Sequence, residues 1–282
     1  MPLASLPLAQ RGMKAMYEAF FNFTRTPFQR DIPPEALYLT PPLQALQDRL
    51  AHSVKHRYFL VVTGDSGCGK TTAIRQFMSS LDPNRTVALY VSESNLTPRN
   101  FYFDVLNQLG VKPHFYRGDA KRQLMKEILA MSADHKLPVI IIDEAHLCNM
   151  EMLTEIRFLL NFNMDSHSPM ALILVGQSEF RDILKKQVYD AISQRIDLRC
   201  FIPPLDRCQT AEYIAAHIFY AAGSPCEIFT DTAISAIFEF SAGLPRKINR
   251  LASLCLMHAA QSSKRFIDDH MVSLMIDGEL SW

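Results

Sequence analysis

The amino-acid sequence predicts an α/β protein in which a parallel sheet is flanked by helices and followed by a small all-helical domain. Five short apolar runs alternate with helical patterns and predict the strands, at 58–64, 86–92, 137–144, 170–177 and, with a weaker signal, 198–204. Because the runs are continuously apolar, their strands should be buried on both faces, as in a parallel sheet covered by helices. After Pro204 the strand signal ends and only helical patterns follow.

Apolar residues at helical spacing predict the helices. Those that accompany the strands are expected at 43–56, 70–80, 97–109, 119–133, 150–162 and 178–185. Those that follow the last strand are expected at 206–222, 230–241, 245–262 and 267–277. Residues 20–42 are rich in aromatics and proline, which predicts an extended, wrapping segment. These patterns divide the chain into an N-terminal segment (1–42), an α/β core (43–204) and a helical domain (205–282).

Composition narrows the class of protein. The chain has 282 residues, of which 48% are hydrophobic, so it can bury a core and is not a disordered chain. Its 29 basic and 29 acidic residues balance, so a polyanionic partner would have to meet a local basic patch. The six cysteines form no CxxC pair, which is typical of a reducing compartment and gives no reason to expect zinc. No apolar run reaches the ~20 residues needed to span a bilayer, so we expect a cytoplasmic protein that does not enter a membrane.

The stretch GDSGCGKT follows the first predicted strand and precedes a predicted helix, and it fits the pattern G-x-x-x-x-G-K-[ST]. Glycines let the backbone turn its N–H groups onto phosphate oxygens, and the helix dipole favours the same charge. Lys70 would reach the β and γ phosphates, and the Thr71 hydroxyl would hold Mg²⁺. A merely glycine-rich turn is the alternative. The predicted nucleotide-binding residues are Gly64, Asp65, Ser66, Gly67, Cys68, Gly69, Lys70, Thr71 and Thr72.

The stretch VIIIDEAH (139–146) predicts the second half of this site. A buried strand that ends in two carboxylates places Asp143 at its tip, where it can bind Mg²⁺, and Glu144 beside it, where it can polarise the attacking water. An acidic pair exposed at a strand end is the alternative. The two boxes together predict hydrolysis of ATP. His146 is interpreted as a packing or relay residue, because no later arginine-rich helicase motif accompanies the tetrapeptide DEAH.

These motifs and those that follow resemble the AAA+ ATPases, which implies a P-loop AAA+ module with a helical lid. The resemblance makes Gln177, at the end of MALILVGQ, the first sensor of the γ phosphate, although the family more often has Asn there. It makes Arg195 the arginine finger that acts on a neighbouring subunit, with Arg181 and Arg199 as competitors. It makes Arg246, in AGLPRKINRL, the second sensor. A solvated or helix-capping role is the alternative for Arg181, Arg195 and Arg199, and backbone geometry alone is the alternative reason for Gly243 and Pro245.

The order TGDSGCGKTT, IIIDEAH, LVGQSEF, QRI and GLPRKINRL is similar to the ExeA-type branch, over about residues 20–275. That branch includes secretion ATPases and the helpers of DDE transposases, with IstB, TnsC and MuB as more distant relatives. Secretion members usually continue into a membrane helix and a further domain, and the end of this sequence at Trp282 favours the helper. The resemblance then implies a DNA-stimulated ATPase that assembles as a ring or helical filament on double-stranded DNA and recruits or activates a DDE transposase. The alternative is a secretion or envelope-assembly ATPase acting on protein partners; a helicase or loader motor is disfavoured.

Two further regions carry binding hypotheses. Residues 111–126, the basic segment, hold five basic residues and one acidic residue, with Phe115 and Tyr116 among them. A solvated helix face is the alternative to DNA binding there. In the N-terminal segment, Tyr38 is expected in an adenine pocket or an inter-subunit clasp, or else in a strap that closes the core. The candidate DNA contacts are Arg99, Lys112, Arg117, Lys121 and Arg122.

Overall fold

The computed structural model describes residues 17–29, 31–33, 36–93, 96–160 and 168–280. The first part of the predicted N-terminal segment, the end of the predicted helix 150–162 and Trp282 lie outside the described residues. Internal contacts divide the chain into two units. The sheet unit comprises 41–66 and 70–203, and the helical unit comprises the residues up to Thr40, 67–69 and the residues from Pro204 onward.

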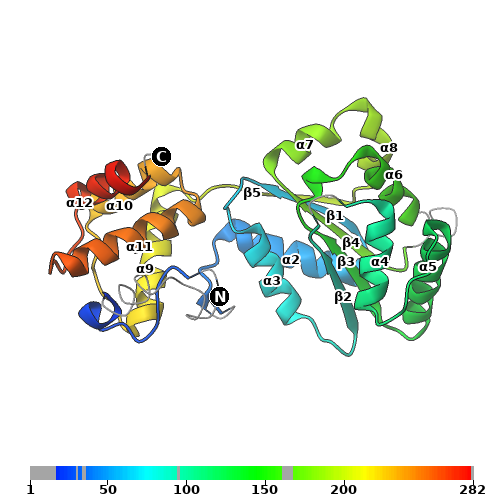
Figure 1. Ribbon diagram of the computed structural model, residues 1–282, viewed down its shortest axis with the longest axis horizontal. Coiled ribbons are helices and arrows are strands. Elements are labelled where there is room, and N and C mark those ends of the chain that lie inside the picture. The colour runs from blue at the N-terminus through cyan, green and yellow to red at the C-terminus, as the bar shows by residue number, and fades with distance from the viewer. Residues whose placement is uncertain (1–16, 30, 34–35, 94–95, 161–167, 281–282) are drawn as a thin grey trace. The chain divides into compact units, whose positions relative to one another are not determined.

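A five-stranded sheet forms the centre of the sheet unit (Figure 1). Its strands stand in the order β2-β3-β4-β1-β5, and every neighbouring pair is parallel. The predicted parallel sheet is therefore confirmed. The strands are β1 (Phe59–Gly64), β2 (Thr86–Val91), β3 (Leu137–Ile142), β4 (Ala171–Gly176) and β5 (Leu198–Ile202).

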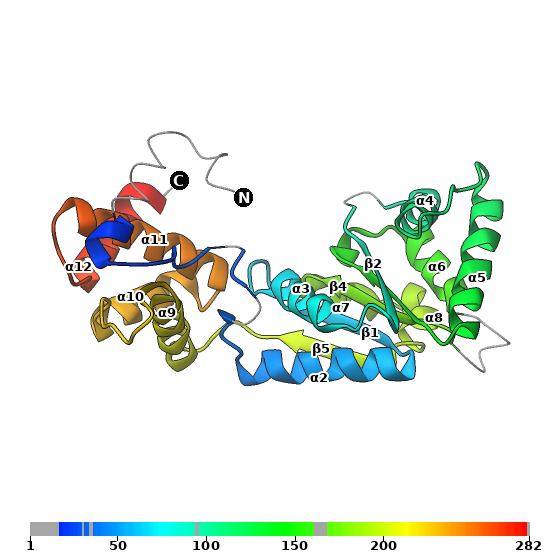
Figure 2. The same cartoon turned by 90° about the horizontal axis from the view of Figure 1, so that it is seen from below.

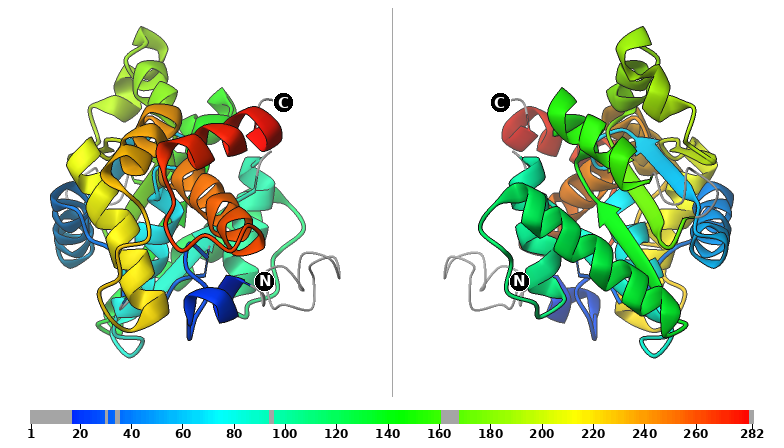
Figure 3. Two further views of the ribbon diagram at one scale, coloured as in Figure 1. Left: turned by 90° about the vertical axis from the view of Figure 1, so that its left-hand side faces the viewer. Right: turned by 90° about the vertical axis from the view of Figure 1, so that its right-hand side faces the viewer.

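Helices cover both faces of this sheet, which explains the continuous apolar runs (Figure 2). Alternate strand residues such as Phe59, Val61 and Ile140 pack in one core with α4, α5, α6 and α7. On the other face, α2 contacts β5, β4 and β1, and α3 packs against α2 and β1. The right-hand view of Figure 3 shows the blue helix α2 on one side of the strands and the teal helix α4 and the green helix α5 on the other. The helices and 3-10 turns of this unit are α2 (Pro41–His56), α3 (Lys70–Ser80), α4 (Pro98–Gln108), α5 (Arg117–Ala133), η3 (Ala145–Leu147), α6 (Met150–Leu159), α7 (Ser178–Leu184), η5 (Gln187–Tyr189) and α8 (Asp190–Ser193).

In the helical unit, the helices that follow Pro204 surround a separate apolar core. Its first helix begins with a capping box, in which the side chains of Asp206 and Gln209 satisfy each other's backbone N–H groups. The helices are α9 (Arg207–Ala222), α10 (Asp231–Ser241), α11 (Pro245–Gln261) and α12 (Asp269–Met275), followed by a short π-helical stretch, η6 (Ile276–Leu280).

The N-terminal segment packs against α9 in this unit. Residues 17–21 are helical, whereas the sequence predicted extended chain from residue 20. After that turn, the backbone N–H groups of Thr24 and Arg25 donate to the carbonyl of Ala221, and Phe28 N–H donates to Nδ1 of His217 at 3.1 Å. Phe28 also stacks on the ring of His217, with centroids 5.0 Å apart. The segment is therefore tied to the helical unit by backbone bonds and buried aromatic rings.

Within the described residues, no helix is both long enough and apolar enough to cross a bilayer.

Candidate nucleotide site

The candidate site lies at the carboxyl edge of the sheet, because β3, β4 and β1 are neighbours and parallel. The chain leaves β1 into the glycine-rich loop, leaves β3 at Asp143 and leaves β4 at Gln177. Ligands of open parallel sheets bind outside this edge. The sheet order thus brings together three segments that are far apart in the sequence.

The glycine-rich loop has the backbone that a phosphate cradle needs. Gly67 and Gly69 have φ of +85° and +98°, a region that side chains with a Cβ rarely occupy. Helix α3 begins at Lys70, so the loop leads directly into a helix N-terminus. The Lys70 side chain is 7% exposed, and its ammonium donates to the carbonyls of Gly64 (2.8 Å) and Asp65 (2.9 Å). The lysine is held along the loop by these two bonds.

Asp143 is the centre of a hydrogen-bonded cluster and is only 3% exposed. Its Oδ2 accepts from the Thr71 hydroxyl at 2.9 Å and from the Tyr90 hydroxyl at 2.7 Å, and its Oδ1 accepts from Glu144 N–H at 2.8 Å. Burial first, and then the bond to Asp143, raise the pKa of Tyr90, so that its hydroxyl stays a donor. Sequence reasoning missed Tyr90, because a tyrosine within an apolar strand carries no motif.

Glu144 stands in a left-handed backbone conformation, with φ 52° and ψ 34°. Such a conformation is uncommon for a residue with a side chain and is often found at functional sites. Its side chain is 45% exposed, and one oxygen, Oε2, lies 3.4 Å from Nδ1 of His146. The same His146 nitrogen lies 3.5 Å from the backbone nitrogen of Gln177. A second bond joins the loops nearby: the hydroxyl of Ser178 donates to the carboxylate of Asp65.

The residues present fit a magnesium ion and nucleotide phosphates. The Thr71 hydroxyl and the Asp143 carboxylate, both oxygen ligands of the kind that Mg²⁺ prefers, are already within hydrogen-bond distance of each other. The backbone N–H groups of the glycine-rich loop and the α3 N-terminus supply donors for phosphate oxygens. The predicted roles of the loop residues, Thr72 included, stay predictions.

The three candidates for the arginine finger lie on different secondary-structure elements. Arg195 follows the short helix α8, and its guanidinium donates to the carbonyl of Ala191 at 3.4 Å. Arg199, on the edge strand β5, donates to the carbonyl and hydroxyl oxygens of Ser193, both at 2.9 Å. Arg181, on α7, stands over the ring of Phe201 at 5.5 Å. Each has a local contact, so these contacts do not select among the three.

Arg246 lies in the first turn of α11, in the helical unit, and its role as a second sensor stays a prediction. The glycine at position 243, shortly before this arginine, is required by the backbone geometry. Gly243 has φ +71°, and a Cβ at this position would lie 1.8 Å from the carbonyl oxygen of Leu205. The peptide N–H of Leu205 also donates to the Gly243 carbonyl at 2.9 Å. Only glycine allows this close approach.

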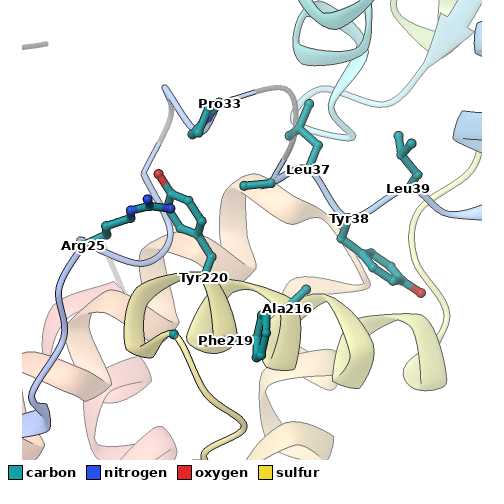
Figure 4. A pocket seen from close by; sticks show the side chains of 10 residues that line it. Arg25, Pro33, Leu37, Tyr38, Leu39, Ala216, Phe219 and Tyr220 are labelled. Atoms are coloured by element: carbon teal, nitrogen blue, oxygen red, sulfur yellow. The ribbon is translucent and has the colours of Figure 1, made fainter.

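Tyr38 lies against α9 of the helical unit. Its hydroxyl donates to the carboxylate of Glu212, and its ring makes an edge contact with Tyr213, at 6.3 Å between centroids. The N-terminal segment and α9 line an open pocket of about 870 Å³, and Arg25 and Tyr220 are among its lining residues (Figure 4). The adenine role of Tyr38 stays a prediction, and its described contacts are those of a strap that packs on α9.

The basic segment meets a buried acid that sequence reasoning did not single out. Glu155, on α6, is 5% exposed; Arg117 lies 2.5 Å from it, Lys121 lies 2.8 Å from it, and Tyr102 donates to it. Burial alone would raise the pKa of Glu155, but the bonds from Lys121, Tyr102 and Arg117 outweigh burial and lower it to about 2. Arg117 also pairs with Glu151 at 2.5 Å. A signal existed, because Glu155 stands among the apolar residues of a predicted helix.

Both aromatic residues of the basic segment and its cations Lys112 and Arg122 are exposed. Phe115 and Tyr116 are each 71% exposed and meet edge to face. Arg99 stands over the ring of Phe115 at 5.0 Å. Lys112 is exposed, and Arg122 pairs with Asp119 on its own helix. Of the five predicted DNA contacts, two are therefore engaged by Glu155 and three lie at the surface, and all five stay predictions.

Comparisons with known proteins agree with this architecture. Residues 51–184 match the family model described as "AAA domain". The chain is 27% identical over 259 residues to General secretion pathway protein A of Aeromonas hydrophila, covering 89% of this chain and 46% of that protein. In structure it is similar to the ORC2 protein of Aeropyrum pernix (TM-score 0.65, 14% identity, 89% of this chain and 71% of that one). It is also similar to Drosophila ORC bound to DNA (TM-score 0.64, 16% identity, 96% and 73%).

The predicted AAA+ fold, with its helical C-terminal region, is confirmed by the similarity to these solved structures. The chain spans about half the length of the secretion-pathway relative that it matches.

Proposed function

We propose that this protein binds ATP at the glycine-rich loop, hydrolyses it to ADP and phosphate, and passes the nucleotide state to a partner. The observation that carries the proposal is the bond between the Thr71 hydroxyl and the buried Asp143 carboxylate. It joins the helix after the glycine-rich loop to the strand end that bears Glu144, as magnesium-dependent phosphoryl transfer requires.

The chain's own groups supply most of the chemistry. Lys70 and the loop N–H groups orient the phosphates, and Thr71 and Asp143 would hold the ion. Bound Mg²⁺ supplies charge neutralisation on the phosphate oxygens. The Glu144 carboxylate, half-exposed beside this cluster, accepts a proton from the attacking water. Gln177 follows the adjacent strand β4 and orients that water and the γ phosphate.

The partner that we favour is a protein, in the manner of a secretion or envelope-assembly ATPase. The supporting observation is the similarity to General secretion pathway protein A across both units of this chain. Because that relative is about twice as long, a protein partner for this chain is a proposal. In this interpretation the engaged pair of Arg117 and Lys121 stabilises α5 against α6 and contacts no polyanion.

A second candidate is the regulator of a DDE transposase that oligomerises on double-stranded DNA. The observation in its favour is the exposed group formed by Arg99, Lys112, Phe115 and Tyr116. Cations beside exposed rings suit phosphates and bases, and such contacts are multiplied in an oligomer. The similarity to an origin-recognition complex whose structure contains DNA supports the fold and does not bear on DNA binding by this chain.

Steady-state ATP hydrolysis with and without duplex DNA, at low and at physiological salt, separates the two candidates. A rate that is indifferent to DNA supports the protein-partner proposal. Stimulation that fades with salt supports the second candidate, because counterion release makes phosphate contacts salt-dependent. Absence of hydrolysis under all conditions, with no ATP binding, contradicts the proposed function itself.

The proposal includes a homo-oligomer in which Arg195 reaches the neighbouring subunit's nucleotide. Arg195→Ala should then hydrolyse ATP slowly even at saturation. Mixing it with the double variant Asp143→Asn/Glu144→Gln should restore part of the activity, because each subunit lacks a different half of the shared site. Mixtures no faster than the two variants measured apart would contradict action between subunits.

A further inference from the structure

His146 stands between the proposed base and the peptide that follows β4. Its Nδ1 lies 3.4 Å from Oε2 of Glu144 and 3.5 Å from the backbone nitrogen of Gln177. The ring is carried by the turn η3, which packs against β4 and α7. Its side chain is only 6% exposed, so little water is available to replace either partner.

One imidazole nitrogen cannot serve both neighbours at once. Nδ1 either carries a hydrogen and donates to the Glu144 carboxylate, or presents a lone pair and accepts from the Gln177 N–H. The Glu144 side chain is 45% exposed, and Nδ1 of His146 is within ion-pair distance of its carboxylate, so the ring is placed to orient it. A base that is oriented by a third group is a recurring arrangement in catalytic sites.

We infer that His146 is a positioning residue for hydrolysis: it orients the Glu144 carboxylate when Nδ1 donates and releases it when Nδ1 accepts from the peptide of Gln177. The ring thereby links the proposed base to the strand end that carries the first sensor. This inference rests on the proposed function, since it gives a role only to a residue that acts through Glu144.

The test compares His146→Leu and His146→Asn in the wild-type chain and in the Glu144→Gln background. Leucine keeps an apolar side chain of similar size without the nitrogen, and asparagine restores a polar group near the position of Nδ1. We expect His146→Leu to lower kcat by about 10- to 100-fold, the cost of misplacing a reacting group. ATP binding should change less than about twofold, because no phosphate contact is lost. His146→Asn should recover part of the rate.

In the Glu144→Gln background, single-turnover rates should be the same with and without the His146→Leu substitution, because the group on which the ring acts is already gone. His52→Leu is the matched control: it makes the same chemical change on α2 at an exposed position and should leave kcat unchanged. Thermal unfolding of every variant shows whether the fold is retained.

Three results would overturn the inference. They are a wild-type kcat in His146→Leu, an equal fold-loss in both backgrounds, or a loss of kcat that follows a loss of ATP binding. If His146→Leu fails to fold, His146→Asn decides by the same criteria. A failure of the proposed function is distinguishable, because the wild-type chain would then neither bind nor hydrolyse ATP.

Discussion

The carboxyl edge of the sheet and the basic segment were both predicted from residue types, and the structure treats them differently. At the sheet edge, Thr71 and Glu144 N–H converge on one buried carboxylate, Asp143. In the basic segment, Arg117 and Lys121 face inward on Glu155, while Phe115 remains exposed. The motif residues at the sheet edge therefore lie together, whereas the basic segment separates into a structural half and an exposed half.

The two regions differ in how strongly the fold constrains the positions of their side chains. The carboxyl ends of parallel strands lie at one edge of the sheet, so residues at strand ends lie close together irrespective of how the helices pack. A cation on a helix has no such constraint, and any acid on the neighbouring helix can neutralise it. This contrast predicts that substitutions at the sheet edge have large effects and that substitutions in the exposed half of the basic segment have small ones.

The largest effect is expected at the sheet edge. Glu144→Gln should retain ATP binding and lower kcat by roughly 10²- to 10⁴-fold, because a general base is lost while the phosphate contacts remain. Lys70→Ala should instead lose ATP binding. Equilibrium binding of a fluorescent ATP analogue and phosphate release measure the two effects. Turnover of Glu144→Gln at the wild-type rate would remove Glu144 from the site.

The two units should lose stability with acid in different pH windows. Burial lowers the pKa of His217, in the helical unit, from 6.5 to about 4. The unfolded chain therefore binds a proton that the folded unit does not, and stability falls as pH drops from about 6.5 to about 4, by up to ~3 kcal/mol. Glu155, in the sheet unit, has its pKa lowered from 4.5 to about 2. Its contribution is complete above about 4.5 and is lost between about 4.5 and 2.

Urea unfolding followed by far-UV circular dichroism, at several pH values, measures these windows. His217→Gln keeps an acceptor for Phe28 N–H and should flatten only the upper window. Glu155→Gln should flatten only the lower one. Identical pH profiles for both variants and the wild-type chain would contradict the assignment.

A smaller effect separates two arginines on the same helix. Arg117→Ala should destabilise the sheet unit by about 1–2 kcal/mol, because it removes charged hydrogen bonds to the buried Glu155. Arg122→Ala is the matched control: its side chain is 77% exposed and its surface pair with Asp119 should contribute under about 0.5 kcal/mol. Urea unfolding at neutral pH compares them. Equal costs would place Arg117 at the surface in solution.

The smallest effect on the fold is expected at the exposed half of the basic segment. Lys112→Ala should change the free energy of unfolding by less than about 0.5 kcal/mol. If this surface binds duplex DNA, the same change should reduce the slope of log affinity against log salt by about 1. Lys264→Ala, exposed after α11, is the control. A slope unchanged in Lys112→Ala would favour the protein-partner proposal.

Local sequence determined the elements and the placement of the chemistry along them. Continuous apolar runs predicted the strands of a parallel sheet, and apolar residues at helical spacing predicted a helix from residue 245, which the structure shows beginning at Pro245. The motifs predicted which residues stand at strand ends, because a strand end is a local property of the chain. The helical turn at 17–21 was not predicted, because the sequence around it carries little helical pattern. Its aromatic residues instead pack in the core of the helical unit.

Tertiary structure alone decided which side chains meet. It placed Tyr90 on Asp143, His146 between Glu144 and Gln177, and Glu155 beneath the basic segment. Except for the pair of Glu144 and His146, these contacts join residues whose distance in space depends on strand order or on helix packing, which no local pattern predicts. Local patterns were therefore sufficient to predict the fold class and the nucleotide motifs. Only the packed chain decided which charges are exposed to a partner and which are used to hold the fold, because burial and pairing are properties of neighbours in space.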